Sequence, residues 1–517
     1  MNVGLATARS ARRYLDRTAA FDEKREFTWK HVDTRSNRFA NFLRGGAALE
    51  KGERVAVWLP NRIEVPEILA GVAKAGLTYV GLNFRMNDAD LRNVFENAAP
   101  RTLVVAGEFR ERAEALCAGS EIRIVDIDAA QGEHSYNSVL QKAADGEPDS
   151  LRHVRPEDDF CIVYTSGTTG TPKGVWFDHA RILQHASVAA LEYELDSNSR
   201  YLLAIPHNSS VNITLAPSMM MGGAVGFVDS RRFDAADFVR LAQKTSATHS
   251  YLVPTQLYRL LESAPDSNCL QSMKTLGYGA APMSPDKAAQ LVDRFGTIFN
   301  QLYGMAEIAS IGTMLRKSDH LAALNGRTEL FRSAGQPSYA IDVRVVDEEG
   351  NDVAPGERGE VIFAAPYMMK GYFRDPERTA STLVDGWIRS GDIAEIDEHG
   401  YFYIVDRKKD LIIRGGYNIA PVEIESVLHR HPDILEVAVI GVPDEEWGEA
   451  IVAVAALKSG ANADRDALLK FVAENSELSS FKRPERIELL DALPKNAVGK
   501  IAKNELRERF GALNAKS

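Results

Sequence analysis

The chain has 517 residues, enough for more than one domain, and its 45% hydrophobic and 26% charged residues are typical of a globular protein with a large core. The formal net charge of −11 argues against a nucleic-acid partner. The cysteines, Cys117, Cys161 and Cys269, lack zinc-site spacing and form no disulfide framework. With no signal peptide and no stretch of membrane-spanning length, the sequence predicts a cytoplasmic protein without a transmembrane segment.

The first part of the chain alternates between helical and strand patterns. Apolar residues at helical spacing predict a helix over 28–43, which Gly45 and Gly46 end, and Asn87 is placed to cap a later helix. The predicted helices lie near 28–43, 63–75, 180–192 and 235–244, and the predicted strands near 54–59, 77–82, 102–105, 160–163 and 201–205. This alternation predicts an α/β sheet with crossover connections.

From about residue 344 the pattern changes to short strands that follow turn pairs. Strands are predicted near 343–346, 359–363, 394–396 and 401–405, and a charged break at 406–410 follows them. The tail predicts strands near 411–413, 436–440 and 451–455, and helices from Pro421 and near 464–474. We therefore predict a large N-terminal domain of layered α/β subdomains plus a β-rich subdomain (1–408), and a small α+β C-terminal domain (409–517).

Residues 164–175, YTSGTTGTPKGV, are the most informative stretch. Glycines let the backbone approach a ligand closely, hydroxyls donate to phosphate oxygens, and Lys173 supplies a positive charge. The stretch is not a P-loop, because Lys173 follows Pro172 and precedes Gly174. It predicts a polyphosphate cradle between two strands, although taken alone it would also suit a flexible surface loop.

This stretch resembles the phosphate-binding signature of the adenylate-forming superfamily, which includes acyl-CoA synthetases, peptide-synthetase adenylation domains and beetle luciferases. Further motifs follow in family order: GAAP at 279–282, QLYGMAE at 301–307, WIRSGD at 387–392, DRKKD at 406–410, IIRGGYNIAP at 412–421 and PKNAVGKI at 494–501. The resemblance covers nearly the whole chain and points to an acyl-CoA synthetase, a fatty or aryl acid–CoA ligase.

The resemblance implies a role for each matched residue in binding MgATP. Tyr303 would stack on adenine near Gln301, and Asp392, after a tight Ser-Gly turn, would hold the ribose. Lys500 would steady the negative charge that develops between the substrate carboxylate and the α-phosphate. The implied catalytic residues are Lys500, Thr165 and Glu307, with Glu307 as the Mg²⁺ ligand. The implied ATP-binding residues are Thr165, Ser166, Gly167, Thr168, Thr169, Gly170, Lys173, Gly279, Ala280, Ala281, Gln301, Tyr303, Gly304, Asp392, Arg407 and Lys500.

The same resemblance implies two steps, between which the C-terminal domain rotates about the hinge Lys409. Glycines at 415–416 would then line a channel for the pantetheine arm of CoA, because a Cβ there would block it. The predicted CoA-binding residues are Gly415, Gly416, Tyr417, Lys482 and Arg483. The predicted acyl-pocket residues are His207, Asn208, Ser209, Gly277 and Gly279, the two glycines being expected to leave space.

One position departs from the family pattern. Ala306 stands where the family has a threonine that donates to the α-phosphate, a loss of about 1–3 kcal/mol unless another donor substitutes. The segment 205–217 has no acidic residue for an α-amino group, which argues against an amino-acid substrate.

The sequence therefore predicts an ATP-dependent carboxylic acid–CoA ligase that uses ATP, Mg²⁺ and CoA. Its acid is expected to be a medium-to-long-chain fatty acid or an aryl acid. An adenylate-forming enzyme with another acceptor and a non-catalytic nucleotide sensor stay open as alternatives, as does a homodimer.

Overall fold

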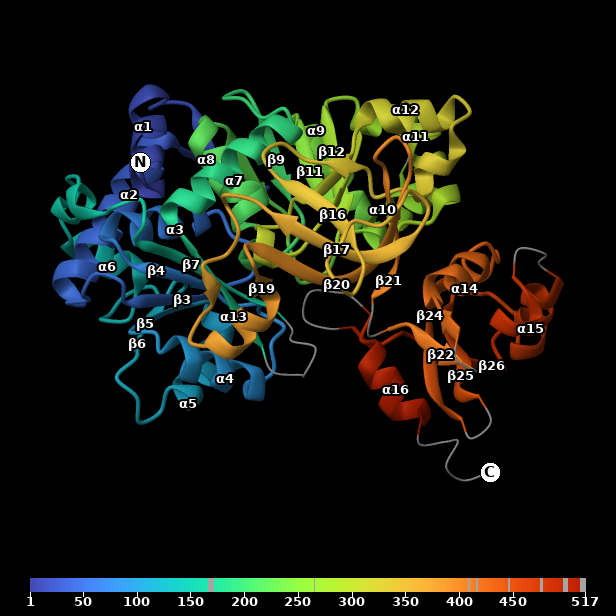
Figure 1. Ribbon diagram of the computed structural model, residues 1–517. Coiled ribbons are helices and arrows are strands. Elements are labelled where there is room, and N and C mark those ends of the chain that lie inside the picture. The colour runs from blue at the N-terminus through green and yellow to red at the C-terminus, as the bar shows by residue number, and fades with distance from the viewer. Residues whose placement is uncertain are drawn as a thin grey trace.

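The computed structural model describes residues 1–165, 172–264, 266–407, 410–414, 417–444, 447–474, 478–495 and 501–511. Within those residues the strands form four sheets. Figure 1 shows three of them in one large body and the fourth, from β22 onward, in a smaller lobe beside it. The predicted mixed α/β fold class is confirmed.

The helices of the described residues cover the sheets and connect their parallel strands. They are α1 (Val3–Arg13), α2 (Trp29–Asn41), α3 (Val65–Ala75), α4 (Asp88–Ala98), α5 (Arg110–Leu116), α6 (Tyr136–Lys142), α7 (His179–Glu192), α8 (Ala216–Met221), α9 (Ala235–Thr245), α10 (Pro254–Ser263), α11 (Pro285–Phe295), α12 (Lys317–Leu324), α13 (Pro376–Thr382), α14 (Pro421–Leu428), α15 (Arg465–Glu474) and α16 (Lys503–Gly511).

The first large sheet carries the hairpin that brackets the predicted phosphate loop. Its order is β18-β8-β7-β4-β3-β5-β6. The strands are β3 (Arg54–Trp58), β4 (Thr78–Gly81), β5 (Thr102–Val105), β6 (Arg123–Asp126), β7 (Asp159–Thr165), β8 (Lys173–Asp178) and β18 (Gly371–Tyr372). All pairings are parallel except those of β8 with β7 and β18, so an antiparallel hairpin closes one edge of a crossover-connected sheet.

The second large sheet positions the predicted nucleotide site. Its order is β15-β14-β13-β12-β11-β9-β10-β1-β2. The strands are β1 (Thr18–Phe21), β2 (Glu26–Thr28), β9 (Arg200–Leu203), β10 (Ala224–Phe227), β11 (His249–Leu252), β12 (Thr275–Gly279), β13 (Phe299–Tyr303), β14 (Thr313–Leu315) and β15 (Gln336–Pro337). The strands β11, β12 and β13 are parallel neighbours, so their carboxyl ends meet at one edge.

Two antiparallel-rich sheets follow. The β-rich part contains β16 (Asp342–Val346), β17 (Arg358–Ala364), β19 (Leu383–Val384), β20 (Trp387–Ile396) and β21 (Phe402–Arg407). The small lobe contains β22 (Ile412–Arg414), β23 (Tyr417–Ile419), β24 (Ile434–Asp444), β25 (Gly448–Leu457) and β26 (Arg486–Leu489). The predicted domain boundary falls between β21 and β22, and its division into 1–408 and 409–517 stays a prediction.

Local signals explain most of these elements. Thr28 caps α2 through its side chain, and Asn87 caps α4 by accepting from the N–H of Asp90 over 2.8 Å. Gly76 ends α3 with a φ of 70°. The largest core cluster spans both large sheets and includes Trp29 from α2, Ile68 from α3 and Tyr201 from β9. Alternating apolar segments thus pack two sheets against shared helices.

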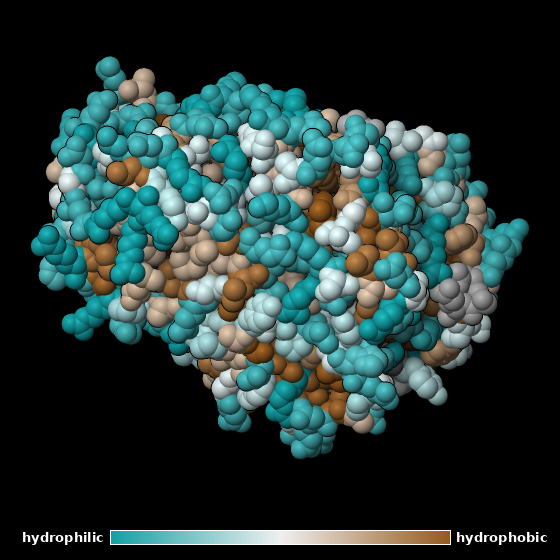
Figure 2. Space-filling view, turned by 90° about the horizontal axis from the view of Figure 1, so that it is seen from above, coloured by the Kyte–Doolittle hydropathy of each residue, from teal (hydrophilic) through white to brown (hydrophobic). Residues whose placement is uncertain are grey.

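None of the described helices combines the length and apolarity needed to cross a bilayer. The face in Figure 2 is mostly hydrophilic, with hydrophobic residues in small groups.

Candidate active site

The hairpin of β7 and β8 holds the two ends of the predicted phosphate loop side by side. Thr165, the last residue of β7, pairs with Lys173, the first of β8. The Oγ1 of Thr165 is buried and has no hydrogen-bond partner among the described residues, so it retains the capacity to bond a ligand oxygen. Five predicted phosphate ligands lie outside the described residues: Ser166, Gly167, Thr168, Thr169 and Gly170.

A charged cluster lies at the base of this hairpin. Lys173 Nζ donates to Glu307 Oε1 over 2.6 Å and to the hydroxyl of Tyr372 over 2.8 Å. That hydroxyl donates to the same Glu307 oxygen over 2.5 Å. Glu307 is only 3% exposed, so these two donors replace water around its carboxylate. Burial, reinforced by the charge of Glu307, raises the pKa of Tyr372 well above its usual range.

Tyr372 is a member of this cluster that the sequence motifs do not single out. It reaches the site because β18 pairs with β8, which places Tyr372 opposite Val175. The N–H of Met369 donates to the carbonyl of Glu307 over 2.8 Å. This bond holds the residues just before β18 against the backbone of Glu307. A pairing between such distant segments leaves no local signal, and a Gly-Tyr-Phe sequence is not distinctive by itself.

The Glu307 carboxylate suits a Mg²⁺ ligand. Both of its hydrogen bonds end on Oε1, and Oε2 has no partner among the described residues. Proteins usually hold Mg²⁺ with one or two carboxylates together with substrate phosphates and water. The described residues contain no cluster of three or more metal-ligating side chains, so an ion here would take most of its ligands from ATP and water.

A tight turn after β13 presents this carboxylate. Ala306–Ile308 form a short 3-10 helix, and Ala309 and Ser310 follow with positive φ values of 56° and 101°. A Cβ on Gly304 would lie 2.2 Å from the carbonyl oxygen of Ser310, so the turn requires glycine there. Backbone strain of this kind is concentrated at functional sites.

Three residues assigned to adenine and ribose meet in space. Tyr303 donates to Asp392 Oδ2 over 2.8 Å, and Arg407 Nε lies 3.3 Å from Asp392 Oδ1. Asp392 on β20 and Arg407 on β21 are directly paired. Burial and the adjacent Asp392 charge raise the pKa of Tyr303 well above its usual range. The geometry supports one site for these residues, and their contacts with a nucleotide stay predictions.

The tight turn predicted before Asp392 is wrong, because Ser390 and Gly391 lie within the long strand β20. Gly391 adopts a φ of 71°, as at a bulge, and the pairing of β20 with β21 shifts register nearby. Ser390 Oγ accepts from the N–H of Asp392 over 3.0 Å and donates to the carbonyl of Val361 over 2.5 Å. The strand therefore bends locally without ending.

The predicted purine-facing segment follows β12. Gly279 is packed so closely that a Cβ would lie 2.1 Å from the carbonyl oxygen of Leu302. Ala280, with a φ of 67°, and Ala281 are both exposed beyond the end of the strand. The amide of Gln301 on β13 lies 3.0 Å from the hydroxyl of Tyr278 on the neighbouring strand. These residues share the carboxyl edge of the second large sheet with Tyr303.

The predicted acyl-pocket residue His207 already has partners inside the protein. Its Nε2 lies 3.0 Å from the carbonyl of Leu59, to which it donates, and its Nδ1 accepts from the hydroxyl of Tyr79 at 3.0 Å. Burial lowers the pKa of His207 to about 4, so the ring is neutral. Ser209 Oγ donates to the carbonyl of Pro206 over 3.0 Å. In contrast, the buried Oδ1 of Asn208 has no partner among the described residues.

The space expected beside the pocket glycines is filled by the protein itself. A Cβ on Gly277 would lie 2.7 Å from the hydroxyl of Tyr193, and one on Gly279 would lie 3.0 Å from the hydroxyl of Tyr251. The expectation that these glycines leave empty space is wrong, because each accommodates a tyrosine. That Gly277 and Gly279 line the acyl pocket stays a prediction. The hydroxyls of Tyr193 and Tyr251 pack against these two glycines.

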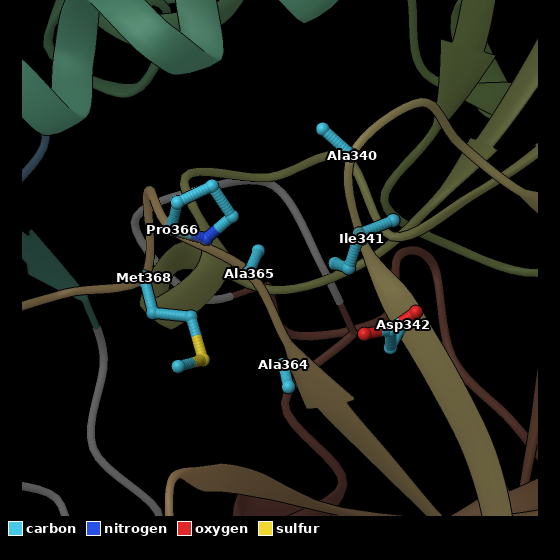
Figure 3. A pocket seen from close by; sticks show the side chains of 7 residues that line it. All are labelled: Ala340, Ile341, Asp342, Ala364, Ala365, Pro366 and Met368. Carbon is cyan, nitrogen blue, oxygen red and sulfur yellow. The ribbon is translucent and has the colours of Figure 1, made fainter.

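An open cavity of about 550 Å³ lies near the Glu307 segment. Figure 3 shows it between the start of β16 and the chain after β17, with Met368 adjoining the residue that bonds Glu307. It is lined by Ala340, Ile341, Asp342, Ala364, Ala365, Pro366 and Met368. Six of its seven lining residues have apolar side chains, Asp342 being the exception, which suits an approach path for an organic substrate.

Aromatic rings and basic side chains of the small lobe lie at the predicted CoA-binding residues. Tyr417 is 69% exposed and its ring lies 5.5 Å from that of Phe481, while Arg414 lies over Trp447 at 5.0 Å. Lys482 forms an ion pair of 2.5 Å with Glu423, and the Nε of Arg483 is buried without a partner among the described residues. Gly415, Gly416, the hinge Lys409 and Lys500 lie outside the described residues.

Similarity to known proteins extends over both the large body and the small lobe. The sequence matches the AMP-binding enzyme family over residues 7–373 and the AMP-binding enzyme C-terminal domain over residues 423–500. Feruloyl-CoA synthase from Amycolatopsis sp is 37% identical over 516 residues, 99% of this chain and 100% of that protein. Medium/long-chain-fatty-acid–CoA ligase FadD8 from Mycobacterium tuberculosis is 34% identical over 492 residues, 92% of this chain and 85% of that protein.

A solved structure has a similar fold over nearly the whole length of this chain. ATP-bound MatB from Rhodopseudomonas palustris is 27% identical, covers 99% of this chain and 100% of its own, and has a TM-score of 0.87. Apo MatB, equally identical, has a TM-score of only 0.74, so the present arrangement resembles the ATP-bound form more closely.

The chain belongs to the AMP-binding enzyme family. The predicted class, an acid–thiol ligase of the adenylate-forming superfamily, is therefore confirmed, as is the use of ATP, Mg²⁺ and CoA at the level of the family. The individual site residues, the hinge and a homodimer stay predictions.

Restoring a hydroxyl next to Glu307 tests the departure at Ala306. We expect Ala306→Thr to leave the rate of pyrophosphate release unchanged or raise it by up to about tenfold, because it adds one donor near the predicted α-phosphate. Single-turnover pyrophosphate release measures this rate. A fall of more than about tenfold would show that Ala306 makes room for another group.

Proposed function

We propose that the chain ligates CoA to an aromatic carboxylic acid that carries an oxygen function and has about the size of a hydroxycinnamic acid. The observation that carries this proposal is a set of buried polar atoms without partners among the described residues, all close to the predicted acyl segment. They are Tyr193 Oη, Asn208 Oδ1, Asn212 Oδ1, Ser218 Oγ and Tyr367 Oη.

Contacts connect several of these groups. The rings of His185 and Tyr367 meet edge to face at 5.2 Å, and His185 faces the backbone of Asn212. Burial lowers the pKa of His185 to about 3, so the ring is neutral. Tyr367 lies between Pro366 and Met368, which line the cavity of Figure 3. Tyr367 therefore belongs to the segment that lines the candidate approach path, and His185 connects it to Asn212.

An alkyl chain would leave these groups unsatisfied, whereas a phenolic or methoxy oxygen would pair with some of them. Each unsatisfied buried group costs about 1–3 kcal/mol. The relatives divide in the same way: feruloyl-CoA synthase is named for an aromatic acid and FadD8 for fatty acids, and the former matches more of this chain. Both observations favour the aromatic acid.

The residues of the chain have clear tasks in the two steps. The substrate carboxylate oxygen attacks the α-phosphorus of ATP, the bond to the bridging oxygen breaks, and pyrophosphate leaves with the electron pair. Lys173 and Tyr372 hold Glu307 in place, and Glu307 would hold Mg²⁺, which offsets phosphate charge when bound. The CoA sulfur then attacks the acyl carbon, and AMP leaves from it.

Matched acids test the proposal. CoA-dependent AMP release should show kcat/KM about 10- to 100-fold higher for 4-hydroxycinnamate or its 3-methoxy derivative than for cinnamate, which lacks the hydroxyl. Octanoate should be poorer, and acetate poorest, because it leaves the pocket unfilled. Trapping with hydroxylamine in place of CoA measures acid activation separately from the acceptor.

Two variants test whether the hydroxyls of Tyr193 and Tyr367 cause the preference for the hydroxylated acid. Tyr193→Phe and Tyr367→Phe keep the rings and should reduce the preference for the hydroxylated acid over cinnamate. Tyr136→Phe, at a buried tyrosine on α6, is the matched control and should leave the preference unchanged. Octanoate or a longer fatty acid as the best substrate would overturn the proposal and would show that ordered water satisfies the buried groups.

A further inference from the structure

A chain of hydrogen bonds leads from a buried histidine to the predicted adenine site. The hydroxyl of Tyr278 on β12 lies 2.8 Å from His320 Nε2 and 3.0 Å from Oε1 of the side-chain amide of Gln301 on β13. Tyr278 and His320 are buried, whereas Gln301 is half-buried at the carboxyl edge of the sheet. These hydrogen bonds therefore connect the inaccessible side chain of His320 to that of Gln301, which a ligand can reach.

The backbone fixes the proton on His320. Its Nδ1 lies 2.9 Å from the carbonyl oxygen of Arg316, which only accepts, so Nδ1 must carry the hydrogen. Burial lowers the pKa of His320 to about 4, which keeps the ring neutral and leaves Nε2 as an acceptor. Packing against Phe299 and Phe331, with ring centroids 6.5 and 6.4 Å away, holds the ring in place.

This tautomer of His320 sets the direction of both hydrogen bonds of Tyr278, the one to His320 and the one to Gln301. Tyr278 donates its only hydroxyl proton to His320 Nε2, so its oxygen can only accept from Gln301. The hydroxyl therefore cannot also donate to Oε1 of Gln301, the amide atom placed nearest to it. The oxygen and nitrogen ends of an amide are distinguished only by their partners, so the amide is turned by 180° and its NH₂ donates to Tyr278. The carbonyl oxygen of Gln301 then points away from Tyr278, toward the accessible edge. Gln301 shares one face of β13 with Tyr303, because side chains alternate along a strand.

We propose that His320 and Tyr278 are positioning residues that select adenine by orienting the amide of Gln301. The carbonyl oxygen of Gln301 accepts a hydrogen bond from the 6-amino group of the purine. A 6-oxo purine presents an acceptor at the same place and is rejected, because two acceptors face each other. This inference rests on the adenylating function, in which Tyr303 and Gln301 lie at the nucleotide, and is independent of the identity of the acid.

Paired nucleotides test the inference. Pyrophosphate release is measured with ATP and with purine riboside 5′-triphosphate, which lacks the 6-amino group. The wild-type enzyme should prefer ATP by about tenfold in kcat/KM, the effect of one hydrogen bond. Gln301→Ala should abolish this preference. His320→Phe and Tyr278→Phe should reduce it to a similar extent, because each removes the constraint on the amide, while the KM of the acid stays unchanged.

His320→Gln is the matched control. Its side-chain oxygen can replace Nε2 as acceptor, so the preference for ATP should be retained. In the Gln301→Ala background, His320→Phe should have no further effect on the preference. These readouts compare two nucleotides on one variant, so a general loss of stability does not imitate them.

Each negative result would contradict a different part of the proposal. A preference that Gln301→Ala removes but that both His320→Phe and Tyr278→Phe retain would overturn the orienting role. No preference in the wild-type enzyme would overturn the contact between Gln301 and the 6-amino group. If the aromatic acid is not the best substrate, this is seen only in the comparison of acids with ATP as the nucleotide. The comparison of ATP with purine riboside 5′-triphosphate is not affected.

Discussion

Replacing Glu307 with glutamine is expected to slow acyl-adenylate formation by about 100- to 1,000-fold. The amide keeps the volume but loses the charge that accepts from Lys173 at 2.6 Å and from Tyr372 at 2.5 Å. It also removes the carboxylate oxygen that is available to a metal ion. ATP–pyrophosphate exchange measures the rate, and a Mg²⁺ titration should show a higher concentration for half-maximal activity.

Another buried carboxylate gives the control. Glu192 binds Arg316 at 2.7 Å and accepts from Ser338 at 2.8 Å, so Glu192→Gln should lower thermal stability. It should leave the Mg²⁺ dependence unchanged. If Glu307→Gln retained adenylation within about threefold at low Mg²⁺, the assignment of Glu307 to the metal would be wrong.

Much of the fold follows from local patterns in the sequence. The predicted strand near 54–59 and helix near 63–75 correspond to β3 and α3, and the loop with Lys173 is bracketed by two strands as predicted. The N-terminal helix α1 was not predicted, because its buried face consists mainly of small residues such as Ala6, Thr7 and Ala11 and not of large apolar ones. Its burial comes from packing against α2, α3 and α8, which no local signal reports.

The site was less predictable than the fold, because its members meet through tertiary pairing. Long motifs identified Glu307, Tyr303 and Asp392, but Tyr372 joins Glu307 only through the edge pairing of β18. Likewise, small residues at Gly277 and Gly279 suggested space. Whether a glycine opens a cavity or admits a neighbouring ring depends on the neighbour, which here lies far away in the sequence.

The described residues on either side of the predicted Lys500 motif are bonded to one another. Lys495 pairs with Ile501 in an isolated bridge, and the N–H of Ala502 donates to the carbonyl of Pro494 over 2.8 Å. Lys495 itself is bound to Glu436 at 2.5 Å. These bonds thus hold Lys495 and Ala502 within the small lobe.

Lys500→Ala is expected to reduce adenylation by about 100- to 1,000-fold, because it removes the positive charge proposed to steady the carboxylate and α-phosphate as they approach. Thioester formation from synthetic acyl-adenylate and CoA should stay within about threefold of wild type, since this lysine is proposed to act only in the first step. Lys495→Ala is the matched control in the same motif and should leave both half-reactions unchanged, because its charge is paired with Glu436. Single-turnover assays separate the two halves. Equal loss of both in Lys500→Ala would contradict a role confined to adenylation and would place this side chain at the acyl-adenylate throughout the reaction.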